Sequence, residues 1–408
     1  RTRAFIVAWV FALAFYFLEY AVRSAPAVMI PQLSAAFDTT ALGVSSIIGI
    51  YYYTYSILSL VAGAALDRFG AKAPVSTGAV VLGTGCMLFS LPAGLAGDGG
   101  RLLQGAGSAF AFTGAVYLAS RGFSPRVLAT AIGATQCVGM LGGSAGQFAV
   151  GPMIERGVGV HTLWIGLGAL CLLNGALLFA VTPKEPAGPA KEGVVGSMWK
   201  PYKVVFSNPQ SYLCGVIAGL LFAPTTIGDM IWGVATFQHD AMLSYHEAVL
   251  TVSMVPLGWV IGCPLLGWVS DSIGRRKPVI IGGALFMIAA LVQIVFAPSL
   301  LPAPLGMLLF GIASGVAMIP YSTMKEVNLD RVKGSATGAI NFLVFGITAG
   351  MGPVYGYLVG RNLAGAADPA VHFRQGGSFW IACTIGAIGG SFFLRETGRA
   401  TQPQPRSV

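Results

Sequence analysis

The sequence predicts an all-α polytopic membrane protein, with twelve transmembrane helices in two pseudo-symmetric six-helix bundles. Three observations support this prediction. Hydrophobic residues make up 55% of the 408 residues and charged residues only 10%, against roughly 25% charged residues in a soluble domain. A helix needs about 20 predominantly apolar residues to cross a bilayer, and twelve such runs occur. One sizeable polar stretch, Thr182 to Asn208, separates the first six runs from the last six.

Each run ends where charges, glycines or prolines interrupt the apolar residues. In the first half the runs cover residues 4–33, 43–66, 73–92, 100–120, 127–153 and 161–181. In the second half they cover 209–237, 246–270, 277–298, 303–323, 335–358 and 376–394. These runs predict an N-terminal bundle over 1–181, a cytoplasmic linker over 182–208, a C-terminal bundle over 209–396 and a cytoplasmic tail over 397–408.

The basic residues predict the orientation of the bundle. Most of the 24 lysines and arginines fall in the loops on one side, and cytoplasmic loops carry an excess of Lys and Arg. Both termini are therefore expected in the cytoplasm and all four histidines outside. We expect an integral protein of a bacterial inner (plasma) membrane, in contact with lipid. The net charge of +9 lies in these short loops, so nucleic acid is not an expected partner.

The sequence carries no pattern for a cofactor, a metal or enzyme chemistry. The six cysteines are scattered singly through apolar runs, which favours neither a disulfide framework nor a zinc site. The glycine-rich segments lack the strand that a nucleotide-binding loop follows. We expect no enzyme activity, no cofactor and no metal. A sensor on the same scaffold would predict an appended soluble domain, for which the tail leaves no room.

The two halves repeat a loop motif with the spacing G-x-x-x-D-x-x-G-x-[KR]. Its first glycine allows close helix packing, its aspartate can cap the next helix or pair with a basic residue, and its second glycine supplies a tight turn. We expect these clusters to latch one conformation of the protein, the one that is open to the outside. The positions are Gly63, Asp67, Arg68 and Gly70 in the first half, and Gly267, Asp271, Gly274 and Arg275 in the second.

With twelve helices in a six-plus-six arrangement, these motifs resemble the major facilitator superfamily. A further element in the fourth run, Arg101-Leu-Leu-Gln104-Gly105-Ala-Gly107, is similar to the superfamily's R-x-x-Q-G-x-G motif. The resemblance implies a transporter whose substrate site lies between the halves near the midplane. It also implies that helices 1, 4 and 7 line the cavity, and that the chain works as a monomer.

Four ionisable side chains inside the membrane runs are candidates for transport chemistry, because such groups are costly there. Glu19 and Arg23 are four residues apart in the first run, so they share one face of a helix. Arg101 lies in the fourth run and Asp229 in the seventh. An arginine fork suits a carboxylate or a phosphate. The alternative is that Glu19 and Arg23 neutralise one another as a structural pair, and that Arg101 only packs helix ends.

The first two helices resemble the anion:cation symporter family in more detail. Glu19-Tyr20-Ala-Val-Arg23, followed by aromatic positions that include Tyr52 and Tyr55, is similar to that family's pattern. The resemblance implies that Arg23 binds a substrate carboxylate. Val22 and Ser108 stand where the pattern has its proton-handling acids. Proton coupling would then depend on Glu19 or Asp229, with Arg101 as a further candidate.

The preferred prediction is a secondary transporter of a small carboxylate-bearing metabolite, an organic anion or an amino acid, working by proton symport. A proton-coupled exporter of a drug, siderophore or metabolite is the alternative. Some polar and aromatic side chains are equally plausible as interhelical contacts or as substrate contacts. The candidates for substrate contact besides Arg23 are Tyr20, Tyr52, Tyr55, Gln136, Trp232 and Asn341.

Overall fold

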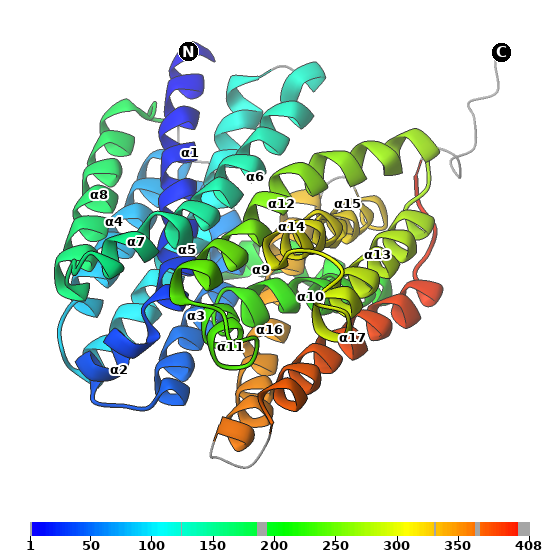
Figure 1. Cartoon of the computed structure of the whole chain (residues 1–408). Coiled ribbons are helices and arrows are strands. Elements are labelled where there is room, and N and C mark those ends of the chain that lie inside the picture. The colour runs from blue at the N-terminus through cyan, green and yellow to red at the C-terminus, as the bar shows by residue number, and fades with distance from the viewer. Residues whose placement is uncertain (1, 124, 186–193, 330–331, 364–367, 399–408) are drawn as a thin grey trace.

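A computed structural model describes residues 2–123, 125–185, 194–329, 332–363 and 368–398. All regular structure in these ranges is helical, as the sequence predicts. In Figure 1 the first half, blue to blue-green, lies on the left, and the second half, green to red, lies on the right.

The helices of each half follow the predicted runs closely at most ends. The first half contains α1 (Thr2–Ser24), α2 (Ile30–Phe37), α3 (Ala41–Phe69), α4 (Lys72–Phe89), α5 (Gly94–Gly122), α6 (Pro125–Phe148), α7 (Val150–Glu155) and α8 (Val160–Val181). The second half contains α10 (Pro209–Ala223), α11 (Gly233–His239), α12 (Tyr245–Ile273), α13 (Lys277–Phe296), α14 (Ala303–Ser314), α15 (Ile319–Glu326), α16 (Lys333–Leu363) and α17 (Pro369–Phe393).

Eleven segments of the described chain are long and apolar enough to cross a membrane. The run predicted over 127–153 is not among them. It forms α6 and the short α7, and the side chains of 125–130 lie outside what the structure describes. It packs along α1 and α12 all the same, so it occupies the place of the fifth helix of the first bundle.

Besides 127–153, three runs predicted as continuous helices are broken. Residues 4–33 form α1, a 3-10 turn (η1, Ala25–Val28) and α2; residues 209–237 form α10, a π-helical turn (η2, Pro224–Asp229) and α11. Residues 303–323 form α14, a 3-10 turn (η3, Gly315–Met318) and the start of α15. A proline lies at each break, and proline lacks the N–H that a continuing helix needs.

The predicted linker contains a helix of its own, α9 (Val194–Phe206). The Tyr202 hydroxyl of α9 donates to the Leu60 carbonyl of α3 at 2.9 Å, so this part of the linker packs into the bundle. Residues 186–193 of the linker and 399–408 of the tail lie outside the described residues.

The halves meet along two helix pairs, α3 with α16 and α6 with α12. Tyr53 donates to the Ala349 carbonyl at 3.2 Å and Ser56 to the Phe342 carbonyl at 2.7 Å, both from α3 to α16. Ser144 of α6 donates to the Ser253 carbonyl of α12 at 2.8 Å. We call the end of the bundle with Thr2, α9 and the end of α17 the terminal end, and the end with α2 and α11 the opposite end.

The repeated loop motif lies at the terminal end and forms tight turns in both halves. Gly70 has φ 70° and Gly274 has φ 68°, a region that favours glycine. The expected packing role of Gly267 is wrong, because a Cβ there would meet nothing within 4 Å; a Cβ at Gly63 would lie 3.6 Å from the Tyr202 hydroxyl.

The basic partner of Asp271 is Arg276, at 2.7 Å, and not the predicted Arg275, which is exposed. Arg276 also pairs with Glu326 at 2.7 Å, and its backbone N–H donates to Glu396 at 2.7 Å. In the first half, Arg68 lies over the Phe69 ring at 5.5 Å. The Asp67 side chain lies outside what the structure describes.

Candidate functional site

Glu19 and Arg23 form an ion pair one turn apart on α1, as their spacing predicts. Both side chains are fully buried. Glu19 Oε1 accepts a hydrogen bond from Arg23 Nη2 and another from the Tyr51 hydroxyl of α3. Arg23 Nε donates to the same Tyr51 oxygen at 3.2 Å. The pair is therefore tied to α3, and each charge has the other as its counter-ion.

Aromatic rings surround the Arg23 guanidinium. Its carbon lies 4.3 Å from the ring centre of Tyr20, 4.7 Å from Tyr55, and 5.2 Å from both Tyr51 and Phe345. Such cation–π contacts are strongest where water is excluded. Phe345 belongs to α16 of the second half, so the cluster lies where the two halves meet.

Each member of the pair keeps one polar atom without a hydrogen-bond partner among the described residues. These atoms are Glu19 Oε2 and Arg23 Nη1. Buried polar atoms are normally hydrogen-bonded. A ligand that offers both a donor and an acceptor would satisfy these two atoms.

Arg101 adds a second buried cation next to this cluster. It lies 4.8 Å from the Tyr51 ring centre. It donates to the Ile48 and Val22 carbonyls at 3.3 Å and to Gln104 Oε1 at 2.6 Å. Most of its donors are thus used to hold α1, α3 and α5 together, the packing role considered as an alternative above. Its positive charge remains in the centre.

Of the predicted aromatic contacts, Tyr20, Tyr52 and Tyr55 all belong to the central cluster. Tyr52 stacks on Phe345 at 6.0 Å and its hydroxyl donates to the Thr226 carbonyl at 3.4 Å. Tyr55 meets Phe345 edge-on at 4.5 Å. These contacts join α3 of the first half to α16 and η2 of the second.

Three other predicted contacts make no hydrogen bond to the Glu19–Arg23 pair among the described residues. Gln136 accepts from the Tyr16 hydroxyl at 3.2 Å, and Asn341 accepts from the Tyr321 hydroxyl at 2.8 Å. Both amides therefore hold tyrosines in place. Trp232 is buried and lines cavities at the opposite end.

Asp229 also lies apart from the pair, at the end of η2. It is 1% exposed, and neither carboxyl oxygen has a hydrogen-bond partner among the described residues. No ion pair to a described residue is formed by Asp229 either. The two acids proposed for proton coupling therefore have opposite surroundings.

Two residues of the cluster were not predicted, Tyr51 and Phe345. Tyr51 lies four residues before Tyr55, and the two rings stack at 5.7 Å. Their helical spacing, which places both on one face of α3, could have identified Tyr51 from the sequence. Phe345 has no such signal, because only the docking of α16 on α3 brings it to the pair.

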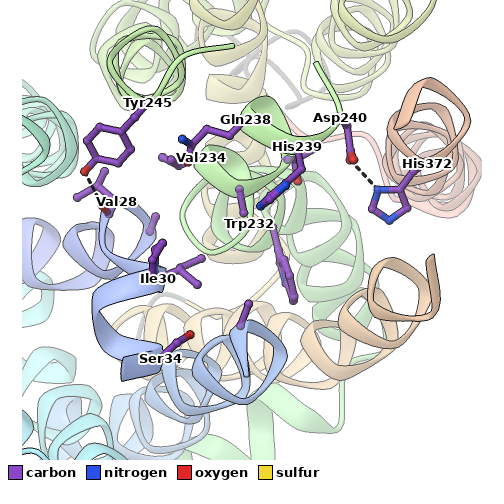
Figure 2. Close-up of a pocket in the computed structure, with 15 residues that line it drawn as sticks. Val28, Ile30, Ser34, Trp232, Val234, Gln238, His239, Asp240, Tyr245 and His372 are labelled. Carbon is purple, nitrogen blue, oxygen red and sulfur yellow. Dashed lines mark hydrogen bonds and ion pairs between the residues drawn. The ribbon is translucent and has the colours of Figure 1, made fainter. Parts of the chain in front are cut away.

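Two cavities lie between the halves at the opposite end. One has a volume of about 240 Å³. It is bordered by Ile30 and Ser34 of the first half and by Gln238 and His239 of the second (Figure 2). A cavity of about 390 Å³ lies between α3, η2 and α16, and Trp232 borders both.

A polar contact closes one side of the first cavity. His372 Nδ1 lies 2.7 Å from Asp240 Oδ2, joining α17 to the end of α11 (Figure 2). Burial raises the pKa of the Asp240 carboxyl, and the hydrogen bond to His372 acts in the opposite direction.

Solved structures with the same fold are transporters. A bacterial homologue of the human lysosomal transporter Spinster, inward-facing and unoccupied, superposes with a TM-score of 0.76 at 15% identity, covering 96% of this chain and 97% of that one. A D-xylose-proton symporter superposes with a TM-score of 0.70 at 15% identity, covering 96% and 97%. At this identity the likeness shows the fold alone.

Sequence relatives are similar over a shorter stretch. Inositol transporter 4 of Arabidopsis thaliana is 29% identical over 157 residues, 38% of this chain and 25% of the relative. The galactose-proton symporter of Escherichia coli K12 is 27% identical over 129 residues, 31% of this chain and 27% of the relative. The matches thus span about a quarter of each relative.

The family model matches far more of the chain than these sequence relatives do. The model of the Major Facilitator Superfamily covers residues 12–353, which includes α1, both loop motifs and most of α16. This family consists of membrane carriers and not of enzymes, and the helical fold agrees with the match. The chain belongs to the Major Facilitator Superfamily.

Proposed function

We propose that this carrier is a proton symporter of a small hydroxylated solute that bears a carboxylate, and that the solute binds at the Glu19–Arg23 pair. One observation carries the choice of site: the fully buried Arg23 keeps Nη1 unpartnered inside an aromatic cage made by both halves. A ligand held there touches the first half and the second at once, as alternating access requires.

The charges at the centre favour an anionic group on the substrate. Two buried arginines, Arg23 and Arg101, face one buried acid, Glu19. An excess positive charge is costly in a water-poor interior, and an incoming carboxylate offsets it. An arginine donates two parallel hydrogen bonds to a carboxylate when its fork is free; here Nη1 is free while Nη2 is held by Glu19.

The relatives support two parts of the proposal, the hydroxyl groups of the substrate and the coupling of its transport to a proton. The relatives that match this chain are named as transporters of inositol, galactose and xylose, and the galactose transporter is named a proton symporter. Tyrosine rings around Glu19 Oε2 and Arg23 Nη1 offer apolar faces beside a donor and an acceptor, which suits a polyhydroxylated molecule. The resemblance of the first two helices to anion:cation symporters stays a prediction.

A neutral polyol is the second candidate, because the named relatives carry neutral sugars and inositols. It needs no excess positive charge, only the Glu19 Oε2 acceptor and the Arg23 Nη1 donor. Amino acids and the lipophilic substrates of an exporter are further classes to include in the test.

A ligand screen on the purified carrier separates these classes. A ligand at about 100 times its dissociation constant adds roughly 2.7 kcal/mol of stability, which a melting curve resolves. We expect sugar acids to raise the melting temperature, and Arg23→Lys to abolish most of the rise, because an ammonium lacks the planar fork. A rise with neutral polyols alone would select the second candidate. A rise with lipophilic cations alone would contradict both.

We also propose that both termini lie in the cytoplasm of a bacterial cell, on the Lys/Arg bias of the loops. Cysteine labelling at the exposed Ser207, near α9, tests this. Reaction with a membrane-impermeant thiol reagent in inside-out vesicles, but not in intact cells, is the expected result.

A further inference from the structure

Asp229 ends a π-helical turn inside the seventh predicted membrane run. The Met230 N–H donates to the Thr225 carbonyl at 2.9 Å and the Trp232 N–H to the Ile227 carbonyl at 3.1 Å, both to a residue five positions back. Single π-turns inside helices occur frequently at functional sites. This turn places a fully buried carboxyl at the boundary between the halves.

The amide of Gln147, on α6 of the first half, faces that carboxyl across the boundary. Gln147 is 0% exposed, and neither its Oε1 nor its Nε2 has a hydrogen-bond partner among the described residues. The two side chains are close enough to interact but are not in hydrogen-bonding geometry. A buried acid and a buried amide, one from each half, are thus neighbours, and neither has a hydrogen-bond partner among the described residues.

The surroundings of Asp229 contain no cation in the described chain. A cavity of about 60 Å³ beside it is bordered by apolar side chains of α13 and α14, by Thr236 of α11, and by Tyr355 and Trp380 of α16 and α17. Tyr355 is the one other titratable side chain on this cavity. From α12, Val252 lies beside Gly233, next to the Asp229 carboxyl. An ionised carboxyl is costly in such a place, whereas the acid form is not.

The same turn contacts the substrate cluster. The Tyr52 hydroxyl donates to the Thr226 carbonyl, three residues before Asp229. Tyr52 packs edge-on against Tyr51 at 5.2 Å, and Tyr51 is hydrogen-bonded to both Glu19 and Arg23. A change in the shape of η2 therefore reaches the Glu19–Arg23 pair through two adjacent tyrosines.

We propose that Asp229 is the proton-binding carboxyl of this carrier, and that it holds its proton while Gln147 is packed against it. The step is the binding of one proton by the carboxylate, and its release when the halves separate and water reaches the acid. Glu19 stays ionised, because Arg23 and Tyr51 stabilise its charge. This inference rests on the proposed proton symport and names the residue that performs it.

Infrared spectroscopy of the purified carrier without substrate tests the protonation directly. We expect the carbonyl band of a protonated carboxylic acid at neutral pH, absent in Asp229→Asn and retained in Glu19→Gln. Asp38→Asn, the same change at an exposed site, is the control and should keep the band. A band lost in Glu19→Gln instead, or none in the unmodified carrier, would overturn the proposal.

Transport in proteoliposomes tests the coupling. At zero membrane potential, a gradient of one pH unit supports about tenfold accumulation of a solute that moves with one proton, since 1.4 kcal/mol is a factor of ten. Asp229→Asn should lose this accumulation while labelled substrate still exchanges with unlabelled substrate, which needs no net proton movement. Accumulation equal to that of the unmodified carrier would overturn the proposal.

Asp229→Glu keeps the experiment decisive if the asparagine variant does not fold. This variant retains a carboxyl, so we expect the acid band to shift and accumulation to be retained. An unshifted band would belong to another residue and would overturn the proposal. If no sugar acid or polyol is transported, the proposed function fails, and the infrared result still decides the protonation of Asp229.

Discussion

The two halves of the carrier share a scaffold but differ at the centre. In the first half, Glu19, Arg23 and Arg101 lie buried among tyrosines and each ion has a charged or polar partner. In the second half, Asp229 is buried apart from that cluster, and neither of its carboxyl oxygens has a hydrogen-bond partner among the described residues. The repeat thus specifies how the helices pack, while we propose that the chemistry is divided, with the substrate at the first half and the proton at the second.

Arg23→Ala is the change expected to have the largest effect. Removing one partner of a buried ion pair leaves the other charge uncompensated, at a cost of about 3–5 kcal/mol in the free energy of unfolding. Substrate binding should be lost as well. Denaturation and binding assays check both, with Arg23→Lys as the variant that keeps the charge. Unchanged substrate affinity in both variants would contradict a substrate site at Arg23.

Tyr51→Phe sharpens the comparison from within the first half. The hydroxyl donates to Glu19 and accepts from Arg23, and a hydrogen bond to a charged group contributes about 2 kcal/mol. We expect a loss of that size in stability and weaker substrate binding. Tyr53→Phe is the matched control, because Tyr53 is 45% exposed and its hydroxyl contacts only the Ala349 carbonyl among the described residues. Equal losses in the two variants would contradict the role given to Tyr51.

Glycine substitutions compare the scaffold of the two halves. At Gly274, with φ 68°, an alanine should lower the free energy of unfolding by about 1–2 kcal/mol. Gly70 has φ 70° and ψ −176°, a combination essentially confined to glycine, so Gly70→Ala should cost at least as much. Gly267→Ala is the control and should be neutral. Thermal denaturation measures all three, and a neutral Gly70→Ala would argue against the turn.

The smallest expected effect is at the terminal end. Arg276→Gln removes the contacts to Asp271 and Glu326 and should lower stability by about 1 kcal/mol, within the range of partly exposed pairs. Arg275→Gln, at the exposed neighbouring position, should be neutral. High salt should shrink the difference between the two variants. A larger loss of stability in Arg275→Gln than in Arg276→Gln would favour a pair between Asp271 and Arg275 instead.

The scaffold was predictable because bilayer thickness and loop charge leave strong marks on a sequence. The two halves, the helix order and the Glu19–Arg23 pair all follow from local spacing. The breaks at η1, η2 and η3 were not predicted, since apolar residues continue through them and a proline alone does not tell a kink from a break.

The partners of the pair were harder to predict, because they come from distant segments. Phe345 reaches Arg23 only through the docking of α16 on α3. Gln147 and Asp229 face each other only because α6 lies along the second half. Arg276 rather than Arg275 meets Asp271, and this depends on where the turn after Gly274 points.

Calorimetric titration of the substrate at two pH values, on the unmodified carrier, Arg23→Lys and Asp229→Asn, tests the division between the halves most directly. Linkage makes substrate affinity depend on pH if a coupled proton binds. We predict that Arg23→Lys weakens binding at both pH values, and that Asp229→Asn binds substrate but loses the pH dependence. A pH dependence that survives in Asp229→Asn, or full affinity in Arg23→Lys, would contradict the division.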